Sequence, residues 1–271
     1  MSESNQKIGR VLKVESTISY PFPALIGIFA SFIVVAFYSV LGLRVYPNRI
    51  YLSSEWDATL VGDELAAILS ITNSKIVTAG FLNLGAIVMF FIPLLFAFNY
   101  AQGFSNGQIR TLLSYPIGRL KLYFVKIGII VLIMSISMIG SGILSIVCLY
   151  PYSINFNYLI LMSIASFLTV LIISATCIFI ATFTRSAPVT AFLGMGLWAI
   201  GFVVTLAPFS PIFLKQLFFP WLLTLINIDS ESLYYMGEAS INTVVSGWLI
   251  TTSLSLILIF ISLVRFYRLE V

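Results

Sequence analysis

The amino-acid sequence predicts an all-α integral membrane protein that forms a single membrane domain over residues 1–271. The composition supports this class, because 60% of the residues are hydrophobic and only 9% are charged, whereas a soluble domain is about 25% charged. The mean hydropathy of the chain is +1.07. The apolar residues also gather into runs of the ~20 residues that a helix needs to cross the hydrocarbon core of a bilayer.

Six apolar runs are expected to be transmembrane helices. The first follows a polar N-terminal segment, has full spanning length and lacks a small-residue cleavage pattern, so we expect a retained helix and not a signal peptide. The expected spans are residues 23–43, 77–98, 122–149, 158–183, 187–207 and 246–264.

The distribution of charge orients these spans, because short loops rich in Lys and Arg stay in the cytoplasm. With six spans, one side of the membrane receives ten basic and three acidic residues, and the other receives four basic and seven acidic residues. The chain is therefore expected to be a multi-pass protein of the cell membrane with both termini in the cytoplasm.

The connection before the last span, residues 208–245, is too apolar for a solvated loop. It contains PIFLKQLFFPWLLTLINI and is interrupted by Pro208, Pro211 and Pro220. We expect one or two short helices that re-enter the outer face of the membrane, with their backbone shielded by the spans.

Several kinds of chemistry are excluded by residues that the chain lacks. It has no histidine, which removes His-based metal sites and nucleophile–histidine pairs, and it has no P-loop for binding ATP. No charged residue is expected near a bilayer midplane, where charges mark ion and proton paths, and Lys126 is expected to extend to the inner surface. We therefore expect no enzyme activity, metal, cofactor or nucleic-acid partner for this chain. Any uphill transport must draw its energy from another protein.

The polar residues inside the expected spans are mostly small. In the third span, Ser137, Ser141 and Ser145 repeat every four residues beside Gly140 and Gly142, a pattern typical of close helix packing. We favour packing over a substrate path for these residues. Asn83 in the second span has two open interpretations, a hydrogen bond between helices or a position in the lining of a cavity.

The segment between the second and third spans, FSNGQIRTLLSYPIGRLKLYFVK at residues 104–126, is basic and amphipathic. Ile109, Leu112 and Leu113 are spaced to share one helix face, whereas Pro116 and Gly118 separate this helix from the third span. The pattern fits either an interfacial helix attracted to anionic lipid or a helix that docks a partner protein.

The order of residues in this segment resembles a signature of ABC-2 type exporter permeases, which are six-span subunits that pair with a separate ATP-binding-cassette ATPase. The similarity is nearest to the permease subgroup of copper-enzyme maturation, which serves nitrous-oxide reductase. The chain departs from the family in having Ser105 and Asn106 where acidic residues usually precede the signature glycine. The matching positions are Gly107, Ile109, Leu112, Leu113, Ser114, Pro116, Ile117, Gly118, Arg119 and Lys126.

The resemblance implies a coupling helix that docks into the ATPase, which would bind ATP and Mg²⁺. It also implies an interfacial amphipathic helix within residues 1–22, and a second permease subunit that is identical or related. The docking residues expected on this basis are Phe104, Gly107, Ile109, Arg110, Leu112, Leu113, Pro116 and Arg119.

The family resemblance further implies that the second and fifth spans line a transport cavity, open alternately to each side of the membrane. Helical spacing then selects Asn83, Ile87 and Phe91 in the second span, and Met195, Trp198 and Phe202 in the fifth. An uncharged aromatic lining suits a lipid-like cargo, but a peptide or an ion complex remains open. Two other classes also remain: a gradient-driven carrier, for which the spans show no charged path, and a membrane scaffold that docks a cytoplasmic partner without transport.

Overall fold

The structure is a computed structural model in which every regular element is a helix, within the residues that it describes. These residues are 22–50, 63–109, 119–150, 154–206, 211–230, 233 and 236–268. The long helices are α2 (Phe22–Ile50), α3 (Asp63–Phe96), α6 (Arg119–Leu149), α7 (Phe156–Thr184), α8 (Ala187–Leu206) and α11 (Ile241–Tyr267). The short helices are η1 (Ala97–Ala101), α4 (Gln102–Ser105), α9 (Ile212–Phe218) and α10 (Pro220–Ile228).

Five described segments are long and apolar enough to cross a membrane: Asn73–Ser105, Arg119–Leu149, Phe156–Thr184, Ala187–Thr205 and Ile241–Tyr267. A shorter apolar stretch, Leu25–Leu41, lies within α2. The prediction of an all-α, multi-pass membrane protein is thus confirmed, whereas the arrangement of six spans stays a prediction.

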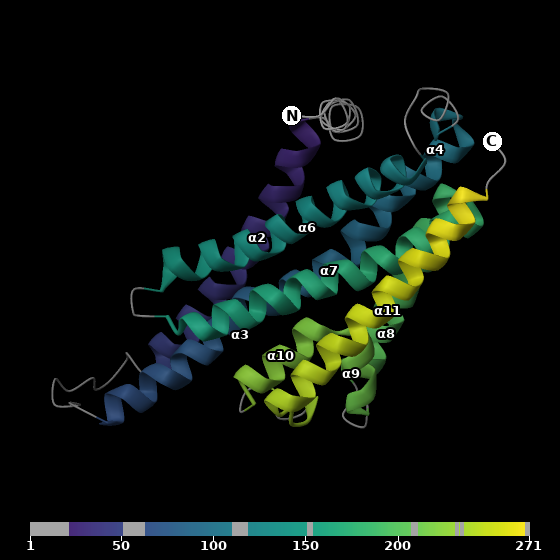
Figure 1. Ribbon diagram of the computed structural model, residues 1–271. Coiled ribbons are helices and arrows are strands. Elements are labelled where there is room, and N and C mark those ends of the chain that lie inside the picture. The colour runs from purple at the N-terminus through teal and green to yellow at the C-terminus, as the bar shows by residue number, and fades with distance from the viewer. Residues whose placement is uncertain are drawn as a thin grey trace, which may run out of the picture.

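The long helices form one bundle with α3 and α7 at its centre (Figure 1). Helices α2 and α6 pack on one side of this pair, and α8 and α11 pack on the other. One end of the bundle carries the start of α2, the short helix α4 and the end of α11, and α9 and α10 lie toward the opposite end (Figure 1). We call the end with α4 the inner end.

The small residues of α6 allow close contact with α3. A Cβ atom placed on Gly142 would lie 2.6 Å from the Phe81 ring, and one on Gly80 would lie 2.9 Å from Ile146. The hydroxyl of Ser145 donates to the Gly142 carbonyl of its own helix at 2.9 Å. Gly142 of α6 and Gly80 of α3 therefore serve helix packing, as small residues at such positions predict, whereas a Cβ placed on Gly140 of the same pattern meets no atom within 4 Å among the described residues.

The connection 208–245 contains two short helices, α9 and α10, which meet at Phe219. A break of this kind leaves backbone groups at both helix ends without partners from the helix itself. The hydroxyl of Thr251 on α11 donates to the carbonyl of Gln216 at 2.9 Å, and Thr169 on α7 accepts a hydrogen bond from the backbone N–H of Trp221 at 3.2 Å. Side chains of neighbouring helices thus complete both sides of the break.

Helix α10 is buried along nearly its whole length. It packs against α7, α11 and α3, and the Trp248 indole donates to the Thr224 hydroxyl at 3.3 Å. The expected short, shielded helices are therefore present, and their depth in a membrane stays a prediction.

Helices α2, α3 and α11 extend beyond the expected spans, and α2 continues to Ile50. Helix α3 begins at Asp63 and not near residue 77, because no Gly or Pro interrupts the chain between residues 63 and 79. Helix α11 begins at Ile241, where the Ser240 side chain accepts a hydrogen bond from the Thr243 N–H. Hydropathy marks the part of a helix that lies in lipid, whereas caps and breakers set where the helix ends.

The contact between α3 and α6 can be tested with two substitutions on one helix. We expect Gly142→Ala to lower the free energy of unfolding by about 1–3 kcal/mol, because the new methyl group must displace Phe81. Gly140→Ala is the matched control, because a Cβ there meets no atom within 4 Å, and it is expected to raise stability by up to about 1 kcal/mol through helix propensity. Thermal unfolding in detergent measures both, and an equal effect of the two substitutions would contradict this packing.

Candidate docking segment and its junction with the membrane helices

We call residues 104–119, which contain the predicted docking residues, the docking segment. Gly107 divides this segment in two. Helix α4 ends at Ser105, Asn106 donates its N–H to the Gln102 carbonyl at 3.0 Å, and Gly107 has a φ of 71°. This left-handed conformation is one that glycine adopts without steric cost. The sequence did not predict this turn, which separates α4 from the helical residues Gln108 and Ile109. The amphipathic helix expected around Ile109, Leu112 and Leu113 lies mostly outside the described residues and stays a prediction.

The turn places Ile109 inside the protein. Ile109 is 2% exposed, and its Cγ1 atom would lie 3.2 Å from a Cβ placed on Gly103. The side chain thus folds back on α4, and the docking role expected for it stays a prediction. The expected docking residues Arg110, Leu112, Leu113 and Pro116 lie outside the described residues.

Aromatic side chains anchor the docking segment to the membrane helices. The ring centroid of Phe104 on α4 lies 5.3 Å from that of Tyr100 and 6.3 Å from that of Phe266 on α11. Phe266 also lies 5.5 Å from Tyr123 on α6. Ring pairs at these distances contribute about 0.5–1.5 kcal/mol each beyond the area that they bury. Phe104, a predicted docking residue, is therefore an anchor of the segment.

Helix α3 joins α4 through η1, a single π-helical turn. Such turns are rare and occur frequently at functional sites. The Lys126 ammonium group of α6 donates to the carbonyl of Asn99 in this turn at 3.2 Å, and the Tyr100 hydroxyl lies 3.3 Å from the Thr182 hydroxyl of α7. The turn is thus bonded to two neighbouring helices.

The environment of Lys126 differs from the expectation that it extends to the inner surface. Its side chain is 6% exposed, and its ammonium group donates a hydrogen bond to a backbone carbonyl of η1. Sequence reasoning missed this role because nothing in the residues AFNYA distinguishes a π turn from a regular helix. The one available signal was a lysine within an apolar run, which is costly unless it has a partner.

Two further hydrogen bonds tie α6 to α11 at the inner end. The Arg119 guanidinium donates to the Tyr267 carbonyl at 2.9 Å, and the Tyr123 hydroxyl donates to the Ile259 carbonyl at 2.9 Å. Arg119, another predicted docking residue, thereby joins the first residue of α6 to the last turn of α11. The inner ends of η1, α6, α7 and α11 are one connected unit.

The expected cavity residues of α3 lie on the side that faces α2. The Asn83 amide donates to the Ser39 hydroxyl at 2.7 Å, and the Phe91 ring lies 5.9 Å from the ring of Phe32. Ile87 is partly buried against the core. Asn83 therefore makes a hydrogen bond between helices, which is one of the two interpretations that its sequence position allows. Its side chain is also exposed.

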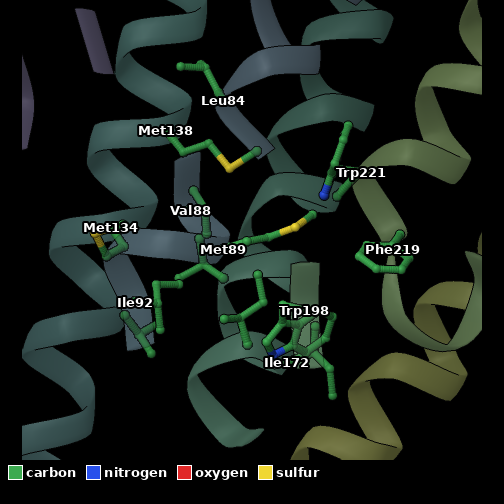
Figure 2. Close-up of a cluster of buried hydrophobic side chains, with 14 of the residues drawn as sticks. Leu84, Val88, Met89, Ile92, Met134, Met138, Ile172, Trp198, Phe219 and Trp221 are labelled. Carbon is green, nitrogen blue, oxygen red and sulfur yellow. The ribbon is translucent and has the colours of Figure 1, made fainter. Parts of the chain in front are cut away.

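The expected cavity residues of α8 lie elsewhere. Trp198 is 1% exposed and makes edge contacts with Phe218 and Phe219, and Phe202 packs on Phe219 and Trp221. Trp198, Phe219 and Trp221 belong to one buried cluster with Val88 and Met89 (Figure 2). Met195 is partly exposed. Asn83 and Phe91 thus contact α2, whereas Trp198 and Phe202 contact the α9–α10 region, and the shared cavity stays a prediction.

Comparisons with known proteins assign no family to the chain. No protein-family model matches it, and no curated protein matches it. The resemblance to ABC-2 permeases consequently rests on the sequence between Gly107 and Lys126.

The role of Lys126 can be tested by amide hydrogen exchange. We expect Lys126→Met to speed exchange over residues 97–105 by about 10- to 150-fold, because a hydrogen bond from a charged donor contributes about 1.5–3 kcal/mol. Lys121→Met is the control on the same helix, since the Lys121 side chain is exposed. Unchanged exchange in the Lys126 variant would show that this bond does not hold the π turn.

Proposed function

We propose that the chain is the transmembrane subunit of an ABC exporter, driven by a separate ATPase that docks at the inner end. One observation carries the proposal: the segment with the permease signature leads directly into a junction that is bonded to α6, α7 and α11. A cytoplasmic motor needs such a junction, because force applied to a loosely tethered loop would not move the spans.

The proposed mechanism uses this junction as a lever. The ATPase subunits bind ATP and Mg²⁺ and close, which pushes the docking segment. The motion passes along the chain through η1 into α3, and through Phe104 and Lys126 into α11 and α6. The tilting helices then expose the cargo path alternately to the two faces of the membrane.

The transport path in this proposal lies between two permease subunits, identical or related. Asn83, Ile87 and Phe91 support this arrangement, because they lie on or near the bundle surface. Of the three candidates on α8, Met195 and Phe202 are partly exposed, whereas Trp198 is buried. The cargo is lipid-like or amphipathic in this proposal, with a peptide or an ion complex as alternatives to be separated by transport assays.

The native cysteines test the proposed orientation, with both termini in the cytoplasm. Cys148 is exposed in the last turn of α6, and Cys177 is buried in α7. We expect a membrane-impermeant maleimide to label Cys148 in right-side-out vesicles, and Cys148→Ser to abolish the signal, because thiols react only where water reaches them. In the Cys148→Ser background, Ser105→Cys should label only in inverted vesicles. The reverse labelling pattern would show that the protein has the opposite orientation in the membrane.

Docking of the ATPase is tested by purification from native membranes. We expect an ATP-hydrolysing subunit to co-purify, and Leu112→Asp with Leu113→Asp to reduce its recovery at least tenfold, because charged side chains disrupt an apolar contact. Leu52→Asp with Leu60→Asp, in the acidic segment expected outside, adds the same charge and should leave recovery unchanged. Recovery of the chain without any nucleotide-binding protein would favour the scaffold alternative.

A further inference from the structure

Helix α11 carries an exposed apolar stripe that leads to the inner end. Ile257 and Ile261 are exposed, and Arg265 and Arg268 follow Ile261 at spacings of four and seven residues, which puts all four on one helix face. The stripe lies within a segment long and apolar enough to span a membrane. It thus offers a surface to hydrocarbon chains, with the two arginines at its inner limit.

Three arginines gather where this stripe ends. Arg265 and Arg268 belong to the last turn and the C-cap of α11, and Arg185 caps the C-terminus of α7. The Arg265 guanidinium lies 5.7 Å from the centre of the Phe183 ring, which brings the ends of the two helices together. All three arginines are exposed.

No carboxylate balances these charges among the described residues of the inner end, which are 97–109, 119–126, 179–190 and 262–268. The carbonyl ends of α7 and α11 supply only partial negative charge, equivalent to about half an electron each. The described residues at the inner end of this helix pair therefore carry a net positive charge that suits an anion.

We propose that the α7–α11 inner end binds an anionic phospholipid, with its phosphate at Arg185, Arg265 and Arg268 and its acyl chains along the α11 stripe. A lipid satisfies both halves of the surface, because it is charged at one end and apolar along its length. A soluble partner protein would meet the arginines but leave the stripe uncovered. Tyr267 and Phe183 lie beside the charges, at the level where aromatic side chains meet lipid headgroups.

The proposal is tested by lipid retention in native mass spectrometry, on full-length protein taken from nanodiscs of phosphatidylcholine mixed with phosphatidylglycerol. We expect the wild type to retain phosphatidylglycerol in preference. Arg185→Gln with Arg268→Gln should weaken retention about 30-fold, since each arginine near an anionic surface contributes about fivefold. The control, Arg44→Gln with Arg49→Gln in the last two turns of α2, removes the same charge at the other end and should leave retention unchanged.

Three results would overturn the proposal. Equal loss in the control would show a response to net charge only, and displacement of the lipid by millimolar inorganic phosphate would show a site for free anions. Loss of a co-purifying ATPase, with lipid retention intact, would assign the arginines to a protein interface. If the double variant does not fold, Arg268→Gln alone is measured, with about fivefold weaker retention expected.

Discussion

A backbone inside hydrocarbon must satisfy its own hydrogen bonds, and the rest of this structure depends on how the chain does so where its helices are interrupted. At Phe219, hydroxyls from α11 and α7 complete the ends of α9 and α10. At Arg185, the turn is closed by its N–H on the Ala181 carbonyl at 2.9 Å. At η1, the ammonium group of Lys126 supplies the bond. The breaks at Phe219 and η1 are thereby tied to neighbouring helices, whereas the turn at Arg185 is closed within α7.

These ties determine which parts of the bundle move together. A hydrogen bond from a charged donor contributes about 1.5–3 kcal/mol, and a neutral one about 0.5–1.5 kcal/mol. The bond of Lys126 to Asn99 therefore contributes more than a neutral hydrogen bond to the contact between η1 and α6, and the ring contact of Phe104 with Phe266 adds comparable energy toward α11. A push on α4 would meet a stiff attachment to α6 and α11 before any bending of the helices themselves.

The sequence predicted the long helices well, because apolar runs of spanning length have few alternative structures. It also predicted the short helices α9 and α10, since the prolines at 211 and 220 limit where helices can begin. It missed the turn at Gly107, because a glycine is compatible with both a helix and a left-handed turn. It could not show that Ile109 is buried, or that the α3 and α8 candidates face different neighbours. Helical spacing defines a face of a helix and leaves open what covers it.

The side chain of Asn83 needs more polar partners than the described residues of the bundle provide. Its amide can make several hydrogen bonds, and among the described residues it donates one, to the Ser39 hydroxyl, although the side chain is exposed within a candidate span. An amide facing lipid without partners costs at least about 1–3 kcal/mol. Water in a cavity or a polar surface of a second subunit would remove that cost. Trp198 and Phe202 already contact Phe219 and Trp221, so within the described residues they do not complete a polar lining with Asn83. In the proposed exporter, the second permease subunit would supply it.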